Sequence, residues 1–147
     1  MKLFKGSIML LISLITIVSL NLQPVSAESV AWYDGLLTKA GQGNPIDSDH
    51  TYSQPFNVTG VSSVTVKGYQ YLPGSSTTAN VKYQIVLRNA IWDEVLAETT
   101  VTGNYPKEGT WFSRVLTLNK PIIGSVSLKI INLNPINGVK VAGNVYK

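Results

Sequence analysis

Cysteine is absent from the 147-residue sequence, and histidine occurs only once, at His50. Without cysteine the chain has no disulfide, no thiol nucleophile and no zinc–thiolate site. A single histidine leaves too few nitrogen ligands for a zinc site, and no serine in a nucleophile-elbow motif accompanies it. Several enzyme classes are therefore excluded, and the folded chain must be stabilised by its hydrophobic core without cross-links.

Long apolar runs are also absent, except at the N-terminus, where the flanks are those of a signal peptide. Lys2 and Lys5 precede "SIMLLISLITIV", an apolar run of about a dozen residues, which is the usual length of a signal-peptide core. "PVSA" then places small residues before a cleavage site that follows Ala27. We expect residues 1–27 to be removed and the protein to be secreted. The alternative is a retained membrane anchor, but the run is short for spanning and is followed by polar residues and Pro24.

The remaining chain, residues 28–147, has 147 − 27 = 120 residues, which suits one domain with its own core. Subtracting Lys2 and Lys5 leaves 12 − 2 = 10 basic residues against 8 acidic ones, a net charge of +2. This balance, without a basic cluster, argues against nucleic acid as a partner. No membrane span is expected after signal cleavage, and a secreted chain without disulfides is more typical of bacteria.

The pattern of apolar residues predicts an all-β domain. In "NVKYQIVLR", residues 80–88, every second side chain is apolar, as in a half-buried strand. Similar runs are separated by turn-forming segments at intervals of about 8 to 14 residues, which is the spacing in sandwiches and barrels. We expect about eight strands in a two-sheet antiparallel β-sandwich of the jelly-roll type.

Three local features carry further expectations. The alternation in "SVTVKGYQYL" changes phase near Gly68, which predicts a bulge. Trp32 and Tyr33 are expected to pack in the first strand, and Trp111, at the start of a later strand, is expected in the core. Residues 35–54 contain several glycines and polar residues and are expected to form one long loop, of the kind that is often functional.

Between Val95 and Asn132 the chain resembles galactose-binding-like β-sandwiches, the fold of many carbohydrate-binding modules. The resemblance rests on "VLAETTVTG", a loop, "GTWFSRVLTLNKP" and then "GSVSLKIIN". It implies a sandwich fold. The calcium-binding loop and the sugar-contacting aromatic residues of that family cannot be placed on this sequence by motif, so no site residue is transferred.

"NPIDSDHTYS", residues 44–53, is the candidate for a metal site. Asp47 and Asp49 supply carboxylate oxygens, and calcium prefers several oxygen ligands, with main-chain carbonyl groups completing the shell. The glycine and distal glutamate of an EF-hand loop are missing. The alternative is that these short polar side chains cap turns, with no cofactor at all. His50, without a nucleophile or a second ligand, is expected to have no catalytic role.

Trp92 in "RNAIWDE" and Tyr105 in "GNYPKEG" are the candidates for ligand binding. Trp92 is expected between two strands, with Arg88, Asn89 and Asp93 beside it. An aromatic ring on a rigid loop can stack on the apolar face of a sugar, while neighbouring amides and charges bind its hydroxyl groups. The alternative for both rings is that they fold back and close an end of the sandwich.

A glycosidase needs two carboxylates on either side of one bond, and the acidic residues here fall mostly at expected strand ends and turns. We therefore expect a secreted, non-enzymatic binding module whose ligand is a glycan or a cell-envelope polymer. The second hypothesis is a secreted protein–protein interaction factor, such as an inhibitor, an immunity factor or a matrix component. A small hydrolase is the third.

Overall fold

The computed structural model describes residues 27–41 and 49–147. The expected signal peptide, except for its last residue, and Asp47 therefore lie outside the described residues. The described residues form nine strands: β1 (Ser29–Leu37), β2 (His50–Tyr52), β3 (Phe56–Asn57), β4 (Ser63–Tyr71), β5 (Asn80–Arg88), β6 (Asp93–Thr102), β7 (Phe112–Thr117), β8 (Ser125–Asn132) and β9 (Val139–Tyr146).

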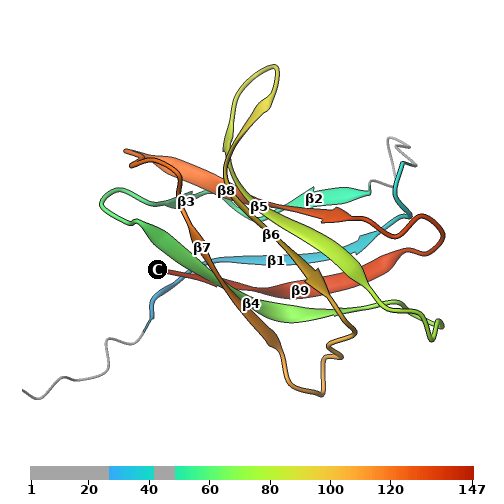
Figure 1. Cartoon of the computed structure of the whole chain (residues 1–147). Helices are drawn as coiled ribbons and strands as arrows, with labels where there is room; N and C mark the ends of the chain where they lie inside the picture. Colours follow the sequence, from blue (N-terminus) through green and yellow to red (C-terminus); the bar gives the residue numbers. More distant parts are fainter. Residues whose placement is uncertain (1–26, 42–48) are drawn as a thin grey trace, which may run out of the picture.

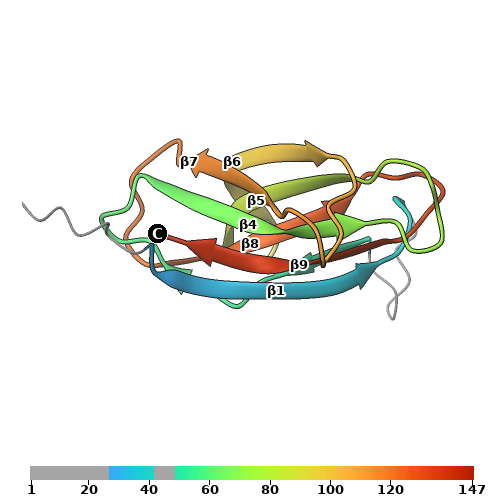
Figure 2. The same cartoon turned by 90° about the horizontal axis from the view of Figure 1, so that it is seen from below.

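Two antiparallel sheets pack face to face, as Figure 2 shows. One sheet has four strands in the order β1-β9-β4-β7. In the other, β2, β8, β5 and β6 are adjacent, and β3 also pairs with β8. The part of the chain that the structure describes contains no helix, and hence no helix long and apolar enough to span a membrane. The predicted all-β, two-sheet antiparallel sandwich is confirmed.

The core lies between the sheets and is filled by alternate residues of the strands. On β5, Val81, Tyr83 and Ile85 have no exposed surface, whereas Lys82 and Gln84 between them are partly exposed. Burying an apolar side chain of this size stabilises the folded state by about 1.5–3 kcal/mol. The alternation predicted for this strand is confirmed from Val81 to Ile85, where it decides which face of β5 contacts the opposite sheet. It breaks at the register shift after Ile85, because Val86 is fully buried and Leu87 is only partly buried.

Gly68 does not form the predicted bulge. The register between β4 and β9 passes through it without a shift, and Gly68 lies opposite Gly143. A Cβ atom at Gly68 would lie 2.1 Å from the Tyr33 hydroxyl oxygen, and one at Gly143 would lie 2.6 Å from it. The inward alternation continues from Val66 through Gly68 to Gln70. A Cβ at Gly143 would also lie 2.1 Å from the Lys67 carbonyl oxygen, and one at Gly68 would lie 2.4 Å from that of Ala142. The two glycines therefore leave room both for the buried Tyr33 side chain and for the close approach of the β4 and β9 main chains.

Residues 35–54 do not form one long loop, because the end of β1 and the whole of β2 lie within this segment. β1 continues into it, and β2 pairs with β8 so that Tyr52 lies opposite Lys129. The sandwich consequently has nine strands in its described part rather than the expected number of about eight. A strand of three residues is too short to show an alternation of its own, so its pairing partner defines it.

Trp32, expected to pack in the first strand, and Trp111, expected in the core, both lie on the surface instead. Trp32 is 56% exposed, and its neighbour Tyr33 occupies the inward position on β1. Trp111 precedes β7 and is more than one third exposed. Its ring packs edge-to-face on Tyr69 at 5.6 Å, and its indole N–H donates to the carbonyl oxygen of Lys107 at 3.0 Å. Both expectations were wrong because a pattern of alternation does not say which of two apolar faces is buried.

Candidate functional site

The hairpin between β5 and β6 carries most of the residues predicted to bind a ligand. Arg88 ends β5 opposite Asp93, which begins β6, and the main-chain N–H of Asn89 donates to the Trp92 carbonyl oxygen at 3.2 Å. A register shift follows Ile85 in β5, and a bulge of this kind bends a strand. The hairpin rises away from the sheets as the yellow loop in Figure 1.

The tip of the hairpin is apolar and open to solvent. Ile91 is 84% exposed and Trp92 is 65% exposed. Beside them lies a hollow of about 470 Å³. Its lining residues are Tyr52, Arg88, Asn89, Ala90, Ile91, Trp92, Asp93 and Lys129. The structure thus brings together four of the five residues predicted for ligand binding, and it leaves the Trp92 ring exposed rather than folded onto the core.

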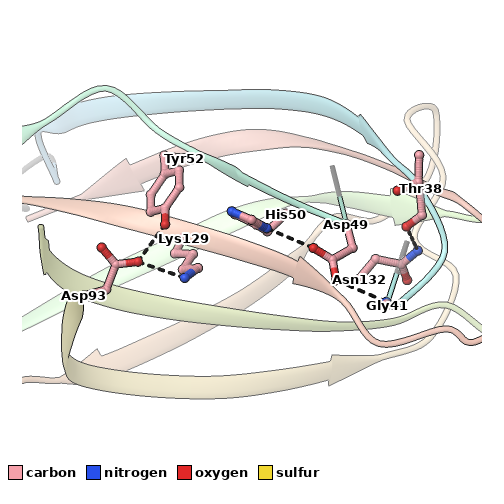
Figure 3. A network of polar contacts seen from close by, with 8 residues as sticks. All are labelled: Thr38, Gly41, Asp49, His50, Tyr52, Asp93, Lys129 and Asn132. Carbon is pink, nitrogen blue, oxygen red and sulfur yellow. Dashed lines mark hydrogen bonds and ion pairs between the residues drawn. The ribbon is translucent and has the colours of Figure 1, made fainter. Parts of the chain in front are cut away.

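Asp93 is the centre of a polar network at this hollow (Figure 3). Its Oδ2 accepts a hydrogen bond from the Tyr52 hydroxyl at 2.6 Å and another from the Lys129 ammonium at 2.8 Å. The hydrogen bond from Lys129, followed by the one from Tyr52, lowers the pKa of Asp93 below its usual range. The carboxylate is therefore ionised at neutral pH, and two neighbours hold it in one position.

The ring of Tyr52 lies close to two cations. The guanidinium carbon of Arg88 is 4.2 Å from the ring centroid, and the Lys129 nitrogen is 5.4 Å from it. Both distances fall within the roughly 6 Å over which a cation is attracted to an aromatic face. Burial, together with the hydrogen bond to Asp93, raises the pKa of Tyr52, so its hydroxyl remains a donor. Tyr52 thereby connects β2 to the base of the hairpin.

Sequence reasoning missed Tyr52 and Lys129, although both line the hollow. They are 41 and 36 residues away from Asp93 in the chain. They meet it because β2 pairs with β8, which places Tyr52 opposite Lys129. Lys129 had one local signal, since it is the cation in the otherwise apolar and small-residue run "SVSLKIINL". Tyr52 had none, because its short strand was read as part of a loop.

Tyr105, the fifth predicted residue, lies at the other end of β5. The preceding Gly103 donates its N–H to Ala79, directly before β5 begins. Tyr105 and Gln70 exchange two main-chain hydrogen bonds, of 2.7 and 3.0 Å. The Tyr105 ring packs edge-to-face on Phe112 at 5.7 Å and is partly buried against the core. It lines neither of the two hollows beside the hairpin.

Asp49 contacts two neighbours in its own part of the chain (Figure 3). Its Oδ1 lies 2.9 Å from Nδ1 of His50, and its Oδ2 accepts the main-chain N–H of Gly41 at 3.2 Å. The hydrogen bond with His50 is the main cause that lowers the pKa of Asp49. Among the described residues, no three side chains of the metal-binding types come together. Asp47 is outside them, so the calcium site remains a prediction.

No protein-family model matches this chain, and no curated protein matches it. Solved structures similar to it include the CBM22-1 xylan-binding domain of Xyn10C from Paenibacillus barcinonensis. That domain is 12% identical, with a TM-score of 0.42 over 82% of this chain and 88% of the other. Another is the CBM22-1–GH10 part of the endo-1,4-beta-D-xylanase Xyn10B from Clostridium thermocellum, in complex with xylohexaose. It is 13% identical, with a TM-score of 0.40 over 82% of this chain and 27% of the other. This likeness identifies neither a family nor a ligand for the chain.

Proposed function

We propose that this protein is a secreted, non-enzymatic binding module for a glycan or a cell-envelope polymer, and that the hollow at the β5–β6 hairpin is its binding site. The observation that carries the proposal is the position of Trp92, whose ring is exposed beside the amide of Asn89 and the ionised carboxylate of Asp93. An exposed aromatic ring next to convergent polar groups suits a ligand with an apolar face and a polar edge.

A sugar ring has this character, because its C–H groups lie on its faces and its hydroxyl groups around its edge. The Trp92 ring would contact a face, while Asp93 accepts hydrogen bonds from hydroxyl groups and Asn89 both donates and accepts them. The hollow of about 470 Å³ is within the range of small-ligand sites, roughly 300–1,000 Å³. Because Tyr52 and Lys129 already hold Asp93, little ordering of the site is needed on binding.

Binding without catalysis is supported by the same set of residues. Of the described residues that line the hollow, Asp93 is the one with a carboxylate. Glycoside hydrolysis by the usual route requires two carboxylates, one of them with a raised pKa so that it can act as a general acid. The lowered pKa of Asp93 is the opposite of that requirement.

Calorimetric titration of the secreted protein with a panel of soluble glycans tests the proposal. Trp92→Ala should weaken binding about tenfold or more, which corresponds to about 1.4 kcal/mol. Its melting temperature should change little, because the ring is mostly exposed. Trp32→Ala is the matched control, since Trp32 is also exposed but lies on the other sheet. Glycan affinity that survives Trp92→Ala would contradict a site at the hairpin.

A protein partner is the second candidate, and the exposed isoleucines at this end of the sandwich favour it. Ile91 is 84% exposed on the hairpin. Ile123 is 93% exposed in the β7–β8 loop, and that loop reaches β6 through the hydrogen bond from Asn119 to Leu96. Ile91→Ser combined with Ile123→Ser should leave glycan affinity unchanged if the ligand is bound through Trp92. A protein partner would instead lose affinity in this double variant.

A further inference from the structure

The positive charge of Arg88 is only partly offset at the hairpin. Asp93 lies near enough for Arg88 to favour its ionised form, but the Asp93 carboxylate is already bonded to Lys129 at 2.8 Å. The other carboxylate at the start of β6, Glu94, is paired with Lys120. Three cations against two carboxylates leave a net charge of +1. Within the part of the chain that the structure describes, the Arg88 side chain forms no hydrogen bond or ion pair.

The contact that Arg88 does form leaves its donors available to a ligand. The guanidinium lies over the Tyr52 ring, 4.2 Å from the centroid. The N–H groups of a guanidinium lie in its plane and form a fork, so they match the two oxygens of a carboxylate. A lysine at this position would supply charge but not this geometry.

Arg88 and Asn89 also stand between two hollows. Both residues line the hollow of about 470 Å³ beside Trp92, and both line a second hollow of about 390 Å³. The second hollow is further lined by Pro55 of the β2–β3 connection and by Ser125 and Ser127 of β8. A polymer that crosses the hairpin could therefore place one unit at Trp92 and a substituent of the next unit at Arg88.

On the basis of the proposed glycan-binding function, we infer that the ligand is an acidic polysaccharide. In this assignment a uronate carboxylate accepts two hydrogen bonds from Arg88, and an adjacent sugar ring stacks on Trp92. Lys129 and Asp93 remain paired and shape the hollow, so the unoccupied guanidinium is the group that selects the anionic ligand.

Polygalacturonate and its carboxyl-reduced counterpart, which has the same backbone without the charge, are the probes for this inference. Calorimetric titration should show about tenfold or tighter binding of the acidic polymer, as expected for charge-assisted hydrogen bonds. Arg88→Gln should bring the affinity ratio of the two polymers close to one. Arg114→Gln is the matched control, because Arg114 is an exposed arginine on β7 and should leave the ratio unchanged.

The outcomes separate this inference from the function on which it rests. Equal affinity of the native protein for both polymers, with binding still lost in Trp92→Ala, would overturn the acidic ligand and keep the glycan site. Binding of poly(glycerol phosphate) as tight as that of polygalacturonate would overturn the uronate in favour of a phosphate polymer. If no glycan of the panel binds in a way that depends on Trp92, the proposed function and this inference both fail.

Discussion

The β5–β6 hairpin and the β6–β7 connection lie at opposite ends of β6, and each carries an aromatic residue. These two residues have different environments. Trp92 stands on a hairpin that leaves the sandwich, with its ring mostly in solvent beside a polar hollow. Tyr105, at the other end, is bridged to β4 through Gln70 and packs on Phe112. The Trp92 ring is therefore accessible from solvent, whereas the Tyr105 ring is held against the core.

The difference originates in what each turn can bond to. The Tyr105 turn is connected to the β4–β5 loop by Asn104, whose side chain accepts the Ala79 N–H and donates to the carbonyl oxygen of Thr77. The hairpin has a register shift at its base, and its polar contacts come from side chains on β2 and β8. Main-chain hydrogen bonds to Gln70 and Ala79, together with the Asn104 side chain, hold the Tyr105 turn against neighbouring strands, whereas the hairpin is held at its base by side chains of β2 and β8.

Replacing Gln70 should have the largest effect on the free energy of unfolding, because Gln70 holds the closed end of the sandwich, which is the end where the Tyr105 turn is bonded to β4. Its side chain is fully buried, donates to the carbonyl oxygens of Val101 and Gly103, and accepts the Tyr83 hydroxyl at 3.0 Å. Gln70→Leu keeps the volume but leaves these buried groups unpaired, which should lower the free energy of unfolding by about 3 kcal/mol. Chemical denaturation measures it.

The control for that variant is Gln84→Leu, which removes a partly exposed amide that bonds to Glu98. Its cost should be below about 1 kcal/mol. Similar losses in the two variants would show that the closed end does not depend on the buried network around Gln70.

Tyr105→Ala tests the contrast between the packed Tyr105 turn and the exposed Trp92 hairpin. Loss of a half-buried ring should lower the free energy of unfolding by about 2 kcal/mol, less than for a fully buried aromatic residue, and should leave ligand affinity unchanged. Trp92→Ala should instead weaken ligand binding and leave the free energy of unfolding almost unchanged. Paired denaturation and binding measurements on the two variants check this, and a loss of affinity in Tyr105→Ala would mean that the closed end also contacts the ligand.

Acid should affect the hairpin end through Asp93. Its folded-state pKa is lowered, so its ion pair stabilises the fold above the usual aspartate pKa of about 3.9, and this stability is lost as the pH falls through the lowered value. Asp93→Asn should therefore reduce the loss of stability below about pH 4. Denaturation from pH 3 to pH 7 measures the change.

Asp49→Asn serves as the comparison for Asp93, since the Asp49 pKa is lowered in the same direction. The Asp49 side chain is 26% exposed against 16% for Asp93, so solvent weakens its interactions more. Its variant should change the acid dependence less. A larger change in Asp49→Asn than in Asp93→Asn would contradict the central role assigned to the hairpin network.

Adding calcium should have the smallest effect on the stability of the fold. Both oxygens of Asp49 already have partners in His50 and Gly41, so melting curves in calcium and in chelator are expected to superimpose. A bound ion at a hundredfold excess over its Kd would stabilise the fold by about 2.7 kcal/mol, which is a shift of several degrees. Such a shift, abolished by replacing Asp47 and Asp49 together with asparagine, would establish the calcium site instead.

Much of the fold was predictable because the relevant signal is local. The period-two alternation on β5 identifies Val81, Tyr83 and Ile85 as core residues without knowledge of any partner strand. The same reasoning grouped Arg88, Asn89, Trp92 and Asp93, because residues this close in sequence share one turn. It failed for Gly68, since the reason for that glycine is the Tyr33 side chain from another strand.

The sequence by itself therefore determined most of the strands, the inward face of β5 up to Ile85 and the position of Trp92 in a turn between two strands. Only the tertiary structure decided that Tyr52 and Lys129 hold Asp93, and that Trp92 is exposed while Tyr105 is packed. The physical reason is that alternation reports on one strand at a time. Which strands pair, and which turn finds partners on another strand, depends on contacts between residues that are far apart in the chain.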